Sequence, residues 1–169
     1  MYTEKIKKIE EGFTIVETLI VLAIAALILA IVLIAVPDLQ RSAKNTDMTQ
    51  AGENLVSGIN SFEGNNNGAL PTAIAQPDTS GNVTISSTVA GAVSASQHVG
   101  NYVITVQSAG TADAASGANF GTIFVQFSAE CPTPSQGSSI TPTASSRETA
   151  VDYTIETSGG NYSEYCLQS

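Results

Sequence analysis

The longest run of apolar residues lies close to the start of the chain. Residues 19–36 are 18 consecutive apolar residues without a charge, a glycine or a proline, in a largely apolar stretch that begins at Phe13. A helix of about 20 such residues spans the hydrocarbon core of a bilayer, which is about 30 Å thick. We therefore expect residues 13–36 to form a helix that crosses a membrane.

After Pro37 the chain becomes polar, but apolar residues recur at spacings of three and four: Met48, Ala51, Leu55, Ile59 and Phe62. This spacing predicts an amphipathic helix that continues the first one, although Gly52 and Gly58 each weaken a helix by about 1 kcal/mol relative to alanine. One helix over residues 13–63 would be roughly 75 Å long at 1.5 Å per residue. Its apolar stripe needs a partner surface, which within the chain only residues 64–169 can provide.

A glycine- and asparagine-rich segment, residues 64–68, should end this helix, because both residue types tolerate the left-handed conformation. Alternation of apolar and polar residues then predicts antiparallel strands at residues 102–107, 122–128 and 151–156, and a weaker strand at 82–89. The expected fold class is α+β, with a sheet of three to four strands packed on the amphipathic half of the helix.

Composition excludes several kinds of site. The net charge is −9, and removal of residues 1–12 takes away three lysines and three glutamates, so it stays at −9. No basic cluster remains for nucleic acid. His98, the only histidine, lies in a polar segment, and Asp78 lies in a predicted turn. Motifs of hydrolases, nucleotide-binding proteins and zinc sites are absent, so we expect neither an enzyme nor a cofactor or metal.

A short charged leader precedes the apolar run. Residues 7–22 read K-K-I-E-E-G-F-T-I-V-E-T-L-I-V-L, and one carboxylate, Glu17, lies inside the apolar stretch. An ionised residue at membrane depth costs about 2.5–3.5 kcal/mol on insertion scales, so Glu17 is a candidate functional residue. Lys5, Lys7 and Lys8 favour a cytoplasmic N-terminus, because basic residues flanking a membrane helix stay on that side.

This pattern resembles the class III signal of type IV prepilins and their relatives. The resemblance implies that a prepilin peptidase cuts between Gly12 and Phe13, that Phe13 is N-methylated, and that Glu17 is the assembly glutamate. It divides the chain into a leader peptide (1–12), a long N-terminal helix (13–63) with a membrane or filament-core segment (13–36), and a globular β-rich head (64–169).

The four-residue spacing of Phe13 and Glu17 can also be explained by helix geometry and charge pairing, without the resemblance. Residues four apart lie on one face of a helix. Cleavage after Gly12 would expose an ammonium group on Phe13, and pairing it with the Glu17 carboxylate leaves neither charge unpaired in hydrocarbon, the outcome that costs most for a buried ion. The pair could close within one chain or between neighbours. The resemblance favours pairing between neighbours, which would set the register of a helical stack.

The proline after the apolar run and the two cysteines lead to further structural predictions. Pro37 can kink the helix, let it loosen when the subunit leaves the bilayer, or mark a simple turn; in the family a helix breaker in this region accompanies local melting in the filament.

Cys131 and Cys166 are an even pair in an exported chain, which favours a disulfide over two reduced, buried thiols. Such a bridge would contribute roughly 4 kcal/mol and resembles the C-terminal disulfide-bounded loop of many pilins.

The sequence thus predicts a structural subunit of a type IV pilus, anchored in the cytoplasmic membrane as a precursor with its head outside, and extracellular once assembled. Its expected partners are further copies of itself, the prepilin peptidase, the inner-membrane assembly platform and the bilayer. The alternatives are a pseudopilin or minor pilin of a type II secretion or DNA-uptake machine, and a monomeric signal-anchored surface binder. An ordinary secretory signal peptide fits less well, because its apolar region spans only 7–15 residues.

Overall fold

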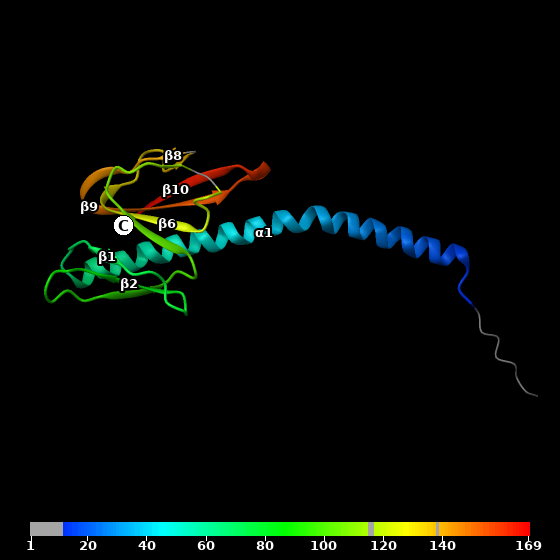
Figure 1. The fold of residues 1–169 in the computed structure, drawn as a ribbon, viewed down its shortest axis with the longest axis horizontal. Helices are drawn as coiled ribbons and strands as arrows, with labels where there is room; N and C mark the ends of the chain where they lie inside the picture. The colour runs from blue at the N-terminus through cyan, green and yellow to red at the C-terminus, as the bar shows by residue number, and fades with distance from the viewer. Residues whose placement is uncertain (1–11, 115–116, 138) are drawn as a thin grey trace, which may run out of the picture. The chain divides into compact units, whose positions relative to one another are not determined.

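The computed structural model describes residues 12–114, 117–137 and 139–169, so the expected leader, including Lys5, Lys7 and Lys8, falls almost entirely outside the described residues. One long helix is followed by a head rich in strands, which confirms the α+β class (Figure 1). The chain divides into two compact units, Met1–Gln40 and Arg41–Ser169.

Helix α1 runs from Ile15 to Asn65 as one element and therefore covers both the apolar and the amphipathic stretches of the sequence. It ends where glycine and asparagine were expected to end it. The amide of Gly68 donates to the Glu63 carbonyl over 2.8 Å, and Asn67 and Gly68 have φ angles of 56° and 78°. This left-handed pair turns the chain out of the helix and satisfies a terminal carbonyl.

The larger sheet has five strands in the order β4-β6-β9-β10-β7. Their bounds are β4 Val103–Gln107, β6 Thr122–Glu130, β7 Gln136–Gly137, β9 Thr143–Glu156 and β10 Tyr162–Gln168. Three of the predicted strands correspond to β4, β6 and the end of β9. The expectation of a purely antiparallel sheet is wrong in one pairing, since β4 runs parallel to β6, with Ile104 opposite Ile123.

Two smaller sheets complete the head. Strands β1 Ala73–Ile74, β2 Asn82–Ser86 and β3 Ala95–His98 form an antiparallel sheet in that order, while β5 Asp113–Ala114 pairs with β8 Ser139–Ile140. A short 3-10 helix, η1 Ser158–Gly160, joins β9 to β10. The expected total of three to four strands is therefore too low. Of the strands that the sequence did not predict, β1, β3 and β5 lie before β6, and β7, β8 and β10 lie after it.

The C-terminal part of α1 lies between the two larger sheets (Figure 1). Its predicted apolar face is confirmed, because Met48, Ala51, Leu55, Ile59 and Phe62 are all buried, together with Ile85 of β2 and Val125 of β6. This part of the helix therefore buries apolar side chains on two sides.

The two glycines of this helix segment have a packing role that the sequence alone did not reveal. A Cβ atom on Gly52 would lie 2.8 Å from Cε1 of Tyr153, and one on Gly58 would lie 2.7 Å from Cδ1 of Ile85. Gly52 thus lets the helix approach the five-stranded sheet, and Gly58 lets it approach the three-stranded sheet. Their cost in helix propensity is offset by this close approach.

Polar contacts hold the start of the head segment of α1 to the end of β9. The side chain of Asn45 donates to the Glu156 carbonyl over 2.6 Å, and the Glu156 amide donates back to Asn45 Oδ1 over 3.0 Å. Arg41 Nε lies 3.7 Å from Glu156 Oε1. Arg41 therefore forms an ion pair with a carboxylate of its own head.

Candidate processing and assembly site

The residues predicted to act in processing and assembly meet at the N-terminal end of α1. Gly12, Phe13, Thr14 and Glu17 line one open hollow at the start of the helix. Every residue from Gly12 to Gln40 is exposed, and the Phe13 side chain retains 85% of its accessible surface. Cleavage of the peptide bond between Gly12 and Phe13 would free an amine at this position.

Thr14 and Glu17 form a reciprocal cap at the helix start. Glu17 Oε2 accepts hydrogen bonds from the Thr14 amide over 2.9 Å and from the Thr14 hydroxyl over 2.8 Å. The Glu17 amide in turn lies 3.2 Å from Thr14 Oγ1. This is the capping-box arrangement, in which a threonine and a glutamate three positions later satisfy two otherwise unpaired donors of the first turn.

Sequence reasoning missed this role of Thr14, although the signal was present. The segment T-I-V-E at residues 14–17 is an S/T-x-x-E pattern directly before an apolar run. The expected partner of Glu17 was the amine of residue 13. In the uncleaved chain, Thr14 holds the carboxylate instead. The carboxylate is therefore already oriented by two donors, one residue away from the amine that cleavage would release.

The apolar part of α1 offers no partner within the described chain for its large side chains. Exposed large hydrophobic residues follow one another along it from Phe13 to Leu39, and most keep more than half of their accessible surface. This is the helix whose length and composition suit a membrane span. Such a continuous apolar surface requires lipid or other helices around it.

Residues 7–33 match a family model described as the prokaryotic N-terminal methylation motif. That motif is the class III prepilin signal, and it contains Gly12, Phe13 and Glu17 in the order and spacing given above. The match supports a type IV pilin-like or pseudopilin protein. No curated protein and no solved structure matches it. Because the match ends at residue 33, the head is characterised by its structure alone.

The motif supports processing by a prepilin peptidase, a membrane-anchored precursor and a structural role for this chain. Among the described residues, no group of three or more histidine, cysteine, aspartate or glutamate side chains could hold a metal ion. His98 lies at the end of β3, rather than in a loop, and its ring is exposed. Its Nδ1 atom lies 3.3 Å from Asn82 Oδ1.

Asp78 serves the turn, as the sequence suggested. Its carboxylate accepts hydrogen bonds from the amides of Ser80 and Asn82 over 2.8 and 3.0 Å. The bond from Asn82, followed by that from Ser80, holds the pKa of this carboxyl below its ordinary value. Hydrogen bonds to a carboxylate favour its charged form, and here they stabilise the connection into β2.

The remaining predicted site residues have distinct positions. Cys131 and Cys166 form a disulfide, with a Cα–Cα distance of 5.7 Å, which confirms the expected bridge. It connects the residue after β6 to β10. Pro37 lies inside α1, so the chain has no turn there. Whether the helix breaks or melts at Pro37 concerns the assembled state and stays a prediction.

Proposed function

We propose that this protein is the structural subunit of a type IV pilus, which polymerises through residues 13–36 after cleavage at Gly12 and N-methylation of Phe13. The observation that carries the proposal is the carboxylate of Glu17 at the start of a helix that is exposed up to residue 40 and apolar over residues 19–36. Such a surface fits a bilayer before assembly and a bundle of like helices afterwards.

The proposed mechanism is a change of partner for Glu17. In the precursor the carboxylate accepts two hydrogen bonds from Thr14. After cleavage, the Phe13 ammonium of a neighbouring subunit replaces these neutral donors with a full positive charge. A charged hydrogen bond is roughly twice as strong as a neutral one, and the difference grows where water is excluded. The exchange would therefore favour docked subunits and set their axial register.

The same proposal accounts for the order of events. The peptidase and the inner-membrane assembly platform would act on a precursor whose head lies outside the cytoplasmic membrane. Pro37 removes a backbone hydrogen bond a few residues before the contacts of Arg41 and Asn45 with the head. It would let the helix loosen during extraction from the bilayer, while the head keeps its own packing.

The experiment that tests the proposal is Glu17→Val in the native host, with Thr18→Val as the matched control. Thr18 is also a polar residue of the first turns, but its hydroxyl donates only to the Ile15 carbonyl. Mass spectrometry of the mature N-terminus reports cleavage and methylation, and electron microscopy of sheared surface material reports filaments. We expect Glu17→Val to be cleaved but to yield no filaments, and Thr18→Val to do both.

Two results would contradict the proposal. Normal filaments from Glu17→Val would remove the role of this carboxylate in assembly. A wild-type protein that retains its first twelve residues would favour the monomeric, signal-anchored surface binder. Methylated Phe13 without abundant filaments would instead favour a pseudopilin or minor pilin, which carries the same signal.

A further inference from the structure

A polar pocket opens on the head where α1 lies beside the connection from β3 to β4. It holds about 230 Å³, and its lining includes Asp47, Gln50 and Asn54 of α1 and His98 and Tyr102 at the two ends of that connection. Asp47, Gln50 and His98 are exposed, so a partner can reach the pocket from solvent. The processing and assembly residues lie at the start of α1, so they do not account for this pocket.

The pocket combines a carboxylate, amide oxygens and an aromatic ring. Burial, followed by the negative charge of Asp47, raises the pKa of Tyr102, in agreement with their place in one pocket. The side-chain amides of Gln50 and Asn54 each carry an oxygen acceptor, and Asn54 is held in place by donation to the His98 carbonyl over 3.0 Å. This set of groups suits a guanidinium, whose planar fork bonds a carboxylate and stacks on an aromatic ring.

The head holds few cations. Residues 41–169 carry three basic and ten acidic side chains, a net charge of −7. Arg41 lies 3.7 Å from Glu156, whereas Lys44 and Arg147 are exposed. Within the part of the chain that the structure describes, Arg147 has no ion pair. Heads of like charge repel one another, so a contact between two copies is favoured where it uses one of these exposed cations.

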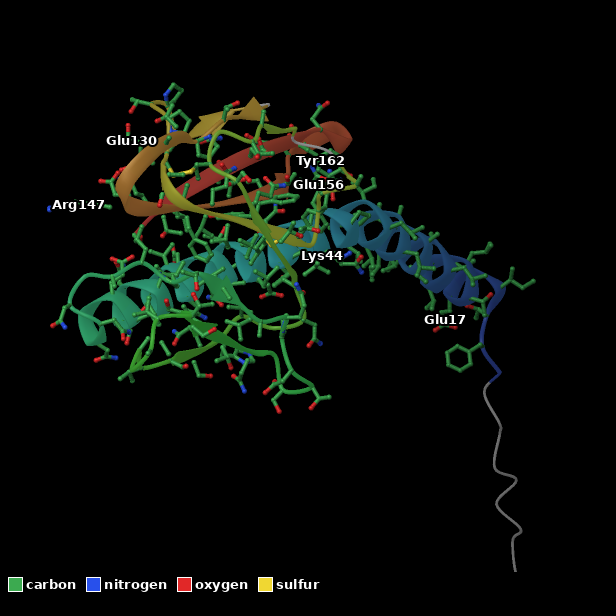
Figure 2. The ribbon with its side chains drawn as sticks, turned by 60° about the vertical axis from the view of Figure 1, so that its left-hand side comes forward. Glu17, Lys44, Glu130, Arg147, Glu156 and Tyr162 are labelled. Atoms are coloured by element: carbon green, nitrogen blue, oxygen red, sulfur yellow. A yellow bond between two sulfur atoms is a disulfide. The ribbon has the colours of Figure 1, made fainter. Side chains whose placement is uncertain are left out.

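Arg147 lies on a bulge of the five-stranded sheet. The register of β9 and β6 shifts here, so that residues 145–148 of β9 stand opposite the single residue Ser128 of β6. Extra residues in one strand interrupt the ladder, bend the strand and change the direction in which a side chain points. Figure 2 shows Arg147 at the outside of the head, where a second molecule can reach it.

The pocket and Arg147 lie toward opposite ends of the head. The end of β9 contacts Asn45, two residues before the pocket begins on α1. At its other end, the Thr149 amide donates to the Ser169 hydroxyl, which donates to a Glu63 carboxylate oxygen over 3.4 Å. Asn45 and Glu63 are about 27 Å apart along α1 at 1.5 Å per residue. Arg147 lies beyond the Glu63 level, so a chain cannot fill its own pocket.

We propose that the guanidinium of Arg147 from one copy enters this pocket of another copy, pairs with Asp47 and stacks on Tyr102. The inference rests on the proposed function, because it supplies a contact between heads in a filament whose helices pack through residues 13–36. A contact that joins two different patches of the same chain repeats from copy to copy, and it builds an open helical filament when the rotation does not close. The pair would fix how neighbouring heads are rotated.

The experiment compares filament yield for charge-reversed variants in the native host. Arg147→Glu and Asp47→Arg each place like charges across the contact, whereas the double variant restores a pair of opposite charges. Like charges across an interface are strongly unfavourable, so we expect each single variant to reduce the yield of sheared filaments by at least about tenfold. The double variant should recover most of the wild-type yield, a rescue that a merely structural role of either residue would not produce.

Lys44→Glu is the matched control, because Lys44 is also an exposed basic residue of the head and its reversal changes the net charge by the same amount. It should leave the filament yield unchanged. Arg147→Lys keeps the charge but loses the planar fork, and it should give an intermediate yield. Thermal unfolding of the purified full chains in detergent micelles should give the wild-type Tm. Should Arg147→Glu fail to fold, Arg147→Gln removes the cation without adding a charge and should also lower the yield.

Normal filaments from Arg147→Glu would overturn the proposal. So would an equal loss in Lys44→Glu, which would assign the effect to net charge, or a double variant as defective as the single ones. Failure of the proposed function looks different, because then the wild type forms no filaments or Glu17→Val forms normal ones, and the contact between heads falls with it. If the wild type and Glu17→Val behave as expected and only the head variants depart, the contact alone is refuted.

Discussion

Gly52 offers the sharpest test of how α1 packs in the head. It lies on the buried face of the helix, and an added Cβ atom would be 2.8 Å from Cε1 and 3.0 Å from Cδ1 of Tyr153, and 3.4 Å from Cδ1 of Leu167. The Tyr153 ring cannot turn aside easily, because it is 2% exposed and stacks on Tyr165 with ring centroids 6.1 Å apart. Gly52→Ala should therefore force the helix and the sheet apart.

Two opposing terms decide the magnitude. Alanine is better than glycine in a helix interior by about 1 kcal/mol. Overpacking a well-filled core by one methyl group costs typically 1–3 kcal/mol. For Gly52→Ala we expect the second term to win, with a net loss of up to about 2 kcal/mol. At Gly64, in the last turn of α1, an added Cβ atom meets nothing within 4 Å, so only the first term applies and the change should stabilise by up to about 1 kcal/mol.

Urea unfolding of the full chain in detergent micelles, followed by near-ultraviolet circular dichroism of its tyrosines, separates the two outcomes. With a slope of about 1–3 kcal/mol per molar urea, Gly52→Ala should lower the midpoint by roughly 0.5–1 M, and Gly64→Ala should raise it slightly. A midpoint that rises equally in both variants would refute the reasoning, because Gly52 would then be only a weak point of the helix and not a site of close approach.

Three other changes test separate parts of the head. The double change Cys131→Ser and Cys166→Ser should lower the free energy of unfolding by roughly 2–4 kcal/mol in the same urea assay, and reduction of the wild type should reproduce this loss. Burial raises the pKa of Glu63, so its charged form opposes folding, and stability from this group is full below the unfolded-state pKa and falls as pH rises through the folded-state value. Glu63→Gln should accordingly raise the Tm at neutral pH but leave it unchanged below about pH 4. Asn45→Ala removes both hydrogen bonds to the backbone of Glu156 and should cost about 1–3 kcal/mol, whereas Asn45→Asp, which keeps one acceptor, should cost less.

The features that the sequence predicted correctly are those encoded by local pattern. The spacing of Met48, Leu55 and Phe62 identified the buried face of α1, and the glycine and asparagine residues after it marked its end. The processing signal was equally readable, because it depends on a few residue types at fixed positions along one helix. Each of these patterns is complete within fewer than 20 consecutive residues.

The strands that the sequence did not predict either bury side chains on both faces of the sheet or contain no large apolar side chain. Strand β10 contains Glu164 and Cys166 on one face and Tyr165 and Leu167 on the other, so it shows no alternation of apolar and polar residues. Strand β3, A-S-Q-H, has no large apolar residue, yet it pairs with β2 along its whole length. Such strands are stabilised by partners distant in sequence, which a period-based reading cannot detect.

The burial of Asp152 and Glu164 is hidden from the sequence for the same reason. Asp152 and Glu164 each stand between neighbours that face the other side of the sheet, and the alternation around Asp152 indicates a solvent-exposed face. That inference was wrong because β5 and β8 belong to a further layer, and β8 lies next to β10. A polar residue on the second face of a sheet is exposed only if nothing covers that face.

If the protein assembles as we propose, the balance between bilayer and filament follows from the composition of the exposed part of α1. Lipid tails are as apolar as leucine, so moving this helix from lipid to a bundle of like helices brings little hydrophobic gain. Packing is aided by small side chains, and Ala23, Ala25 and Ala26 allow close approach of helix backbones. The largest remaining difference is the charge of Glu17, whose cost in hydrocarbon of about 2.5–3.5 kcal/mol corresponds to a factor of more than fifty in an equilibrium constant. Without this charge, the helix would be about equally stable in lipid and in a bundle of like helices. One ion pair of that strength per subunit would therefore be enough to favour the bundle.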